Sequence, residues 1–225
     1  MATPITDRLR AVLCAGGLCA GVLAVAWLNA GCARLPYTTR VIQQDPRVTV
    51  TLQREIEPAK YGHPIALTAA QVNEILRGFT IRKQVSLPLR WFAEEEPPNQ
   101  LFREDERLVL APALAEAFRQ AGPGERLYFE LTAPGQNPRY DRDLTAGWLA
   151  IRGPLLHLTI EYFHVQTPAT RFSPYDLYYP TPRAEARSYV LYFEPGRFWM
   201  LDRNTGQRGV EYEAFLKTGP VPRER

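Results

Sequence analysis

The stretch Trp148–Val165, WLAIRGPLLHLTIEYFHV, places two apolar runs on either side of the pair Gly153-Pro154. Short runs rich in aliphatic, β-branched and aromatic residues that flank such a pair indicate two strands joined by a tight turn. Every second position of the later run is apolar, which puts four side chains on one face: Leu156, Leu158, Ile160 and Tyr162. The stretch therefore predicts an antiparallel hairpin of residues 148–152 and 155–165.

Three further segments have the pattern of strands. Apolar residues alternate with more polar ones in two of them, at Val48, Val50 and Leu52 and at Leu127, Phe129 and Leu131. This period of two is typical of a strand with one buried face. In the third segment, Tyr189–Phe193 and Phe198–Leu201 flank Pro195-Gly196, and this pattern predicts a second hairpin.

Two helices are predicted between the first strand and the later ones. Thr68 can cap the first helix, and Gln71 stands three residues later, where a capping box requires it. Apolar residues then follow at helical spacing, at Val72, Ile75, Leu76 and Phe79. Gly78 is expected to help end this helix.

The second helix is predicted between Glu104 and Ala121, and Gly122-Pro123 is its stop signal. Its apolar face consists of Leu110, Leu114, Ala117 and Phe118. Because Pro112 lacks a backbone donor, we expect the helix to kink there or to restart with Pro112 in its first turn.

The order of strand, two helices and at least five strands indicates an α+β fold. We expect a largely antiparallel sheet with the two helices packed on one face. Residues 47–225 would form this single domain, which is long enough to bury one core. Irregular segments are predicted at about 80–103, 133–143 and 166–187.

The start of the chain has the order of an export signal. Arg8 and Arg10 precede an apolar run from Ala11 to Leu28, and small residues then lead to Cys32. The stretch Leu-Asn-Ala-Gly-Cys at 28–32 resembles the lipobox of bacterial lipoproteins, although Asn29 stands where an aliphatic residue is usual. The resemblance covers only this signal. It implies that residues 1–31 are removed, that Cys32 carries fatty acyl groups such as palmitate, and that residues 32–46 are a lipidated tether.

Two other readings of this leader are open. Residues 11–30 are about long enough for an uncleaved transmembrane anchor, and ordinary cleavage after Ala30 would release a secreted protein. The cysteines favour the lipoprotein, because all three lie in the leader or at its end, at Cys14, Cys19 and Cys32. An exported domain whose single cysteine stands at the lipidation site is what this interpretation requires.

The charge balance argues against a nucleic-acid partner. The chain has 27 basic and 24 acidic residues, and loss of Asp7, Arg8 and Arg10 with the leader would leave a net charge of +2. A dedicated nucleic-acid binder usually has a clustered basic face and a more basic domain.

Motifs for catalysis, cofactors or metals are not found in the sequence. The three histidines are His63, His157 and His164, and strand alternation puts His157 and His164 on opposite faces. The three serines stand outside any nucleophile elbow, and there is no glycine-rich phosphate loop. Acidic residues at 94–96, and Asp141 and Asp143, are interpreted as solvated loop residues. We therefore predict no enzyme activity, no cofactor and no metal.

Two stretches are candidates for a partner or membrane surface. The first is basic and aromatic, with Arg82, Lys83, Arg90 and Trp91, and such residues can dock on anionic head groups or an acidic partner. The second holds Tyr175, Tyr178 and Tyr179 among prolines, and tyrosine offers a large amphipathic contact area. The competing interpretation is that these rings pack onto the protein's own core or sheet.

The sequence thus favours a non-enzymatic envelope lipoprotein, an accessory or structural component that presents its domain to an envelope protein partner. Ala33 follows the lipidated cysteine where an inner-membrane signal would be aspartate, so the outer membrane facing the periplasm is expected. One alternative is a lipid- or glycan-binding module that assists envelope transport or assembly, which a deep apolar pocket would favour. Another is a cell-wall hydrolase, which would need two carboxylates converging in a cleft.

Overall fold

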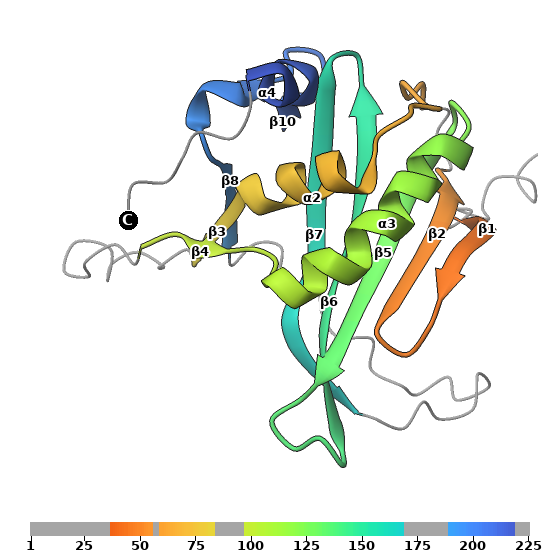
Figure 1. Cartoon of the computed structure of the whole chain (residues 1–225), viewed down its shortest axis with the longest axis vertical. Coiled ribbons are helices and arrows are strands. Elements are labelled where there is room, and N and C mark those ends of the chain that lie inside the picture. Colours follow the sequence, from red (N-terminus) through yellow and green to blue (C-terminus); the bar gives the residue numbers. More distant parts are fainter. Residues whose placement is uncertain (1–36, 56–58, 84–96, 169–188, 219–225) are drawn as a thin grey trace, which may run out of the picture. The chain divides into compact units, whose positions relative to one another are not determined.

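The computed structural model describes residues 37–55, 59–83, 97–168 and 189–218. Figure 1 shows a large antiparallel sheet with helices across one face. Its strand order is β1-β2-β5-β6-β7-β10-β9. The predicted α+β class, with a largely antiparallel sheet, is confirmed. The strands are β1 (Tyr37–Gln44), β2 (Val48–Arg54), β5 (Glu125–Pro134), β6 (Asp141–Arg152), β7 (Leu155–Pro168), β10 (Arg208–Glu211) and β9 (Trp199–Leu201).

The central strands follow the alternation of the sequence. β2 and β5 pair from Val48 opposite Leu131 to Arg54 opposite Glu125, so their alternate apolar residues meet on the same face. β6 and β7 form the predicted hairpin, and Gly153 supplies the positive φ of +55° in its turn. Both strands extend further than predicted, to Asp141 and Pro168.

Helix α2 (Ala69–Gly78) begins and ends where the sequence predicts. The Thr68 hydroxyl accepts a hydrogen bond from the backbone N–H of Gln71, and the Gln71 side chain accepts one from the backbone N–H of Thr68. This capping box satisfies donors that the first turn leaves open. The helix ends at Gly78, since Phe79 already has extended backbone. A side chain at position 78 would overlap the ring of Phe193, so glycine is required there.

Helix α3 (Glu104–Gln120) runs through Pro112 as one element, so a restart at Pro112 is not needed. In a regular helix the backbone N–H of residue 112 would donate to the carbonyl oxygen of Leu108, and proline has no N–H. Pro112 and Leu108 both lie on the exposed side of the helix. Water can bond that carbonyl there, which lowers the cost of the proline. The opposite side of α3 packs on β2 and β5.

A second, three-stranded sheet has the order β4-β3-β8, and we call it the small sheet. It contains β3 (Phe79–Lys83), β4 (Asn99–Gln100) and β8 (Tyr189–Phe193). Two predictions are wrong here. Residues predicted to be irregular from 80 onward form β3, and β8 pairs with β3 while β9 pairs with β10. Instead of a hairpin turn, the 3-10 turn η2 (Gly196–Phe198) carries the chain from one sheet to the other.

β1, β4, β10 and a short helix that follows β10 also lie where no regular structure was predicted. β1 occupies much of the predicted tether, so the tether prediction is wrong for residues 37–44. The ladder of β1 with β2 has two register shifts, between Thr38 and Arg40 and between Val41 and Gln43. These irregularities break the period of two that would have revealed the strand. Helix α4 (Tyr212–Thr218) has seven residues, too few for a helical period to stand out.

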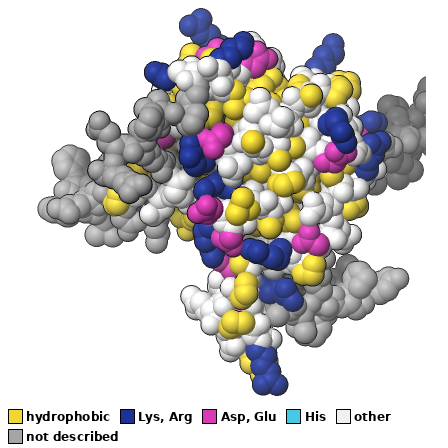
Figure 2. All heavy atoms as spheres, viewed as in Figure 1, with side chains coloured by type: hydrophobic (Ala, Val, Ile, Leu, Met, Phe, Trp, Pro, Cys, Tyr) yellow, Lys and Arg dark blue, Asp and Glu magenta, His cyan; other side chains and the backbone are white. Residues whose placement is uncertain are grey.

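One core lies between the large sheet and its helices. Its largest fully buried side chains include Phe102, Phe118, Phe129, Leu110 and Leu114. Figure 2 shows that charged side chains on the helix side lie mainly around the margin of the described surface. Within the part of the chain that the structure describes, no helix is both long and apolar enough to cross a bilayer.

Candidate functional site

Most residues of the predicted partner surface lie outside the described residues. They are Arg90, Trp91, Tyr175, Tyr178 and Tyr179, and the lipidation site Cys32 lies outside as well. Arg82 and Lys83 are in β3. Lys83 is the cross-strand partner of Tyr189, the first residue of β8. Segment 84–96 follows Lys83 in the chain, and segment 169–188 precedes Tyr189. The two candidate stretches are therefore connected to the small sheet at paired positions of neighbouring strands.

The outer face of the small sheet, defined by Arg82, Val190 and Tyr192, is amphipathic and partly exposed, since Arg82 is half-buried and Thr80 on the same face is buried. Arg82 stands opposite Val190, and its guanidinium lies 5.6 Å from the centre of the Tyr192 ring. Val190 is 36% exposed and Tyr192 is 39% exposed. Sequence reasoning missed these two residues, although positions two apart in the predicted strand Tyr189–Phe193 share one face.

An apolar pocket lies between the inner face of the small sheet and β7, and we call it the inter-sheet pocket. It has a volume of about 180 Å³, and hydrocarbon makes up most of its wall. Pockets for small ligands are typically concave and mainly apolar. The lining residues are Ile81, Tyr189 and Leu191 from the small sheet, and Leu158, Thr159, Ile160, Glu161 and Phe163 from β7.

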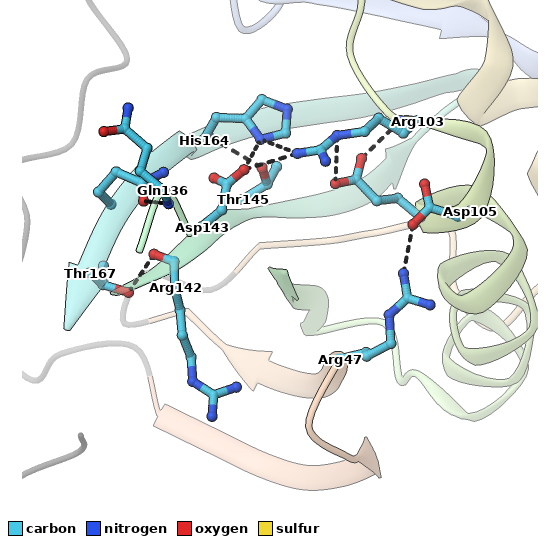
Figure 3. Close-up of polar contacts among 11 residues, drawn as sticks. Arg47, Arg103, Asp105, Gln136, Arg142, Asp143, Thr145, His164 and Thr167 are labelled. Carbon is cyan, nitrogen blue, oxygen red and sulfur yellow. Dashed lines mark hydrogen bonds and ion pairs between the residues drawn. The ribbon is translucent and has the colours of Figure 1, made fainter. Parts of the chain in front are cut away.

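A polar cluster lies next to this pocket, because the ring of its member His164 contacts the pocket residue Phe163 with a centroid distance of 4.5 Å. Figure 3 shows Arg103 from the start of α3, Asp143 from β6 and His164 from β7 pointing toward one another. Asp143 Oδ2 lies 2.8 Å from His164 Nδ1 and 2.9 Å from an Arg103 guanidinium nitrogen. Sequence reasoning placed Asp143 in a solvated loop, which is wrong, because its side chain is only 13% exposed.

The backbone of β7 is irregular where it presents His164. His164 has a φ of +50°, a conformation that residues other than glycine seldom adopt. The register of β7 with β6 shifts between Leu144 and Ala146 and again between Ala146 and Gly147. A side chain on Gly147 would overlap the Thr159 carbonyl oxygen, so glycine allows the strands to approach at the second shift. Bulges of this kind redirect side chains, and this one directs His164 toward Asp143.

The cluster fixes the imidazole in one orientation. His164 Nδ1 lies 2.8 Å from Asp143 Oδ2 and 3.0 Å from an Arg103 guanidinium nitrogen, so it donates to the carboxylate in one tautomer and accepts from the guanidinium in the other. Arg103 also binds Glu106, since its backbone N–H donates to Glu106 Oε2 at 2.8 Å and its Nε lies 3.5 Å from Oε1. Two carboxylates therefore neutralise one guanidinium, and the group of three carries a net charge of −1 before His164 is counted.

The other two histidines lie in separate, buried places. His63 stands between Tyr61 and Phe118, and burial lowers its pKa to about 4. Burial also lowers the pKa of His157, whose Nδ1 lies 3.1 Å from the Arg208 carbonyl oxygen. In the described residues, no three His, Cys, Asp or Glu side chains lie close enough together to hold a metal ion.

Asp143→Asn tests whether the polar cluster ties α3 to the β6–β7 hairpin. The variant loses the charge that both Arg103 and His164 contact, so we expect the free energy of unfolding to fall by about 1–3 kcal/mol. Asp105→Asn is the matched control, because Asp105 forms an exposed ion pair with Arg47 at 2.7 Å. The control should change stability by at most about 0.5 kcal/mol. Urea unfolding measures both, and equal effects would contradict a structural role for the cluster.

The pKa of His63 predicts a loss of stability in mild acid. The unfolded chain takes up a proton on this residue near its ordinary pKa of 6.5, whereas the folded chain resists protonation down to about 4. The free energy of unfolding therefore falls as the pH drops through this window, by about 2 kcal/mol between about pH 7.5 and about pH 5. His63→Gln should reduce the dependence of the free energy of unfolding on pH, measured by urea unfolding. The pH dependence that remains would then be assigned to His157. An unchanged slope in the variant would contradict this assignment.

No protein-family model, curated protein or solved structure matches the chain. Its function therefore has to be inferred from its own residues and geometry.

Proposed function

We propose that the protein is a non-enzymatic, lipid-anchored envelope component that holds its α+β domain close to a membrane and presents it to an envelope protein partner. The observation that carries this proposal is the short distance along the chain between Cys32 and β1, which begins at Tyr37. Four residues, 33–36, lie between them and can span at most about 14 Å. Acylation of Cys32 would thus keep the sheet near the bilayer, and we expect this to be the outer membrane on its periplasmic side.

The strength of such an anchor follows from its hydrocarbon. Each buried methylene contributes about 0.8 kcal/mol, so one acyl chain binds only marginally, whereas several chains hold a protein stably. The domain itself does not need a membrane-spanning element for this role.

The surface that best suits a partner is the outer face of the small sheet. Arginine and tyrosine are enriched in protein interfaces, and Arg82 and Tyr192 already stack there. The two candidate stretches identified in the sequence join the same end of this sheet through Lys83 and Tyr189.

A lipid-binding module is a second candidate function, which the inter-sheet pocket favours. The pocket is apolar and lies between the two sheets. A hydrolase of cell-wall polymer has less support. The carboxylates of Glu106 and Asp143 both form ion pairs with Arg103. The two carboxylates of a glycosidase would instead have to face the substrate.

Replacement of Cys32 by serine tests the anchor. In cells supplied with labelled palmitate, we expect the unchanged chain to carry label and to fractionate with membranes, and the Cys32→Ser variant to lose both properties. Cys14→Ser and Cys19→Ser are matched controls that should keep the label, because both residues would leave with the signal. Mass spectrometry that finds an intact leader, or a start at any residue other than modified Cys32, would overturn the proposal.

A photoreactive residue at position 192 tests the partner surface. In the full lipidated chain within its native envelope, we expect irradiation to give one discrete adduct with another envelope protein. The control position is Leu108 on α3, which is 64% exposed and belongs to a different face. Identical adducts from both positions, or none from position 192, would argue against a partner at the small sheet.

A further inference from the structure

The inter-sheet pocket has an apolar interior. Leu158 and Ile160 line it from β7, and Ile81 and Leu191 line it from the small sheet. Ile81 is 3% exposed and Leu158 is 5% exposed, so these walls belong to the packed interior of the protein. A hydrocarbon group placed between them would be removed from water without leaving a polar group unpaired.

The volume of the pocket limits the size of such a group. An apolar cavity of about 150 Å³ holds one benzene molecule, and the inter-sheet pocket has a volume of about 180 Å³. By that comparison the pocket holds roughly seven carbon atoms. A short alkyl chain or a single ring fits this space, whereas a complete membrane lipid is too large.

Two polar residues of β7, Thr159 and Glu161, interrupt the apolar wall. In the ladder of β6 with β7, Ile160 and Tyr162 pair with adjacent residues of β6, so Glu161 between them is the extra residue of a β-bulge. Glu161 is partly exposed, and it forms no hydrogen bond or ion pair with the residues that the structure describes. The pocket is therefore lined by an unpaired carboxylate next to a hydroxyl group.

The charges around Glu161 favour a cation. Burial and, to a smaller degree, the charges of Glu161 and Glu130 raise the pKa of Tyr162, so both carboxylates lie near this hydroxyl group. Basic side chains nearby are engaged elsewhere. Arg126 forms an ion pair at 3.2 Å on the sheet, and Arg82 stacks on a ring of the outer face of the small sheet. The polar side of the pocket therefore has a negative potential.

Two aromatic rings complete the lining. Phe163 and Tyr189 meet edge to face, with their centres 5.2 Å apart, and they come from opposite sides of the pocket. Aromatic rings attract organic cations, most strongly when the cation has lost its water. The carboxylate and hydroxyl oxygens of β7 can in addition accept the N–H donors of a primary ammonium group. Hydrocarbon walls, rings and carboxylate together favour an amine with an apolar chain.

We propose that the inter-sheet pocket binds a small primary amine with an apolar group of about seven carbons, and that Glu161 and Thr159 hold its ammonium group. This inference goes beyond the proposed anchor, because the ligand is a separate molecule and its binding does not require acylation of Cys32. It narrows the second candidate function to a cationic ligand. An anion such as a fatty acid would be repelled by the unpaired carboxylate.

Photolabelling of the full lipidated chain in nanodiscs of zwitterionic lipid tests this binding. The probe is an alkylamine of about seven carbons that carries a diazirine on its chain. We expect the labelled peptides to contain residues 158–163 or 189–191. Label spread evenly over the protein surface would overturn the proposal. Acylation of Cys32 is judged separately, by palmitate labelling.

Unlabelled competitors of equal chain length separate the effect of charge from that of hydrocarbon. Heptan-1-amine should compete about ten-fold more strongly than heptan-1-ol, because only the ammonium group forms a charge-assisted hydrogen bond with Glu161. The carboxylate of the same length should compete least, and a carboxylate that competes as well as the amine would contradict the site. If Nα-acetyllysine amide competes more strongly than heptan-1-amine, the occupant is a lysine side chain of a protein partner and the small-amine proposal fails.

Two pairs of variants separate the pocket from general effects. Glu161→Gln removes the charge and keeps the size of the side chain, so it should weaken amine binding about ten-fold and leave the alcohol unaffected. Its control is Glu213→Gln, on α4, where the side chain is 62% exposed. Leu191→Trp fills the pocket and should reduce labelling about ten-fold or more, whereas Leu201→Trp, at a position 55% exposed on β9, should leave it unchanged.

The first pair keeps the test valid even if Leu191→Trp unfolds, because Glu161→Gln breaks no described hydrogen bond or ion pair. Equal amine binding by Glu161→Gln and Glu213→Gln would refute the site.

Discussion

The burial of α3 against β2 and β5 is the constraint on which the rest of the structure depends. Alternate residues of β2 and β5, such as Val50 and Phe129, meet Leu110, Leu114 and other side chains of α3 in a core with almost no exposure. Because a strand exposes its two faces at alternate positions, a shift of one residue would expose this entire set. The register of the sheet is thereby fixed, and with it the place where β6 and β7 can depart from regularity.

Elements with an uninterrupted period could be predicted from the sequence. The capping box at Thr68, the apolar face of α3 and the alternation around Phe129 are local patterns, and the structure confirms them. β1 could not be recognised because its two register shifts interrupt the alternation. The pairing of β8 with β3 could not be predicted from local pattern either, because β3 lies more than a hundred residues earlier in the chain. The segment beyond Pro195-Gly196 is a much nearer candidate for a hairpin partner.

The candidate sites depend on such long-range pairing. Arg82 and Lys83 could be recognised in the sequence as a basic pair. Only the pairing of β3 with β8 places them beside Tyr189, which follows the tyrosine- and proline-containing stretch in the chain. The cluster of Arg103, Asp143 and His164 joins three elements and requires a histidine in an uncommon backbone conformation. Alternation alone predicts a regular β7, so the direction of His164 could not be obtained from the sequence.

The edge position of β1 bears on how far the proposed lipid anchor would let the domain move from the bilayer. β1 is an edge strand that pairs with β2, and none of its described side chains belongs to the fully buried core. Its other contacts include surface hydrogen bonds from Thr39 to Glu125 and from Arg40 to Gln120. Peeling it away would release eight residues, or about 26 Å of extra chain, while the packed strands from β2 onward stay intact. If Cys32 is acylated as proposed, tension on the anchor would detach this edge strand before the buried strands, and the domain could then lie further from the bilayer.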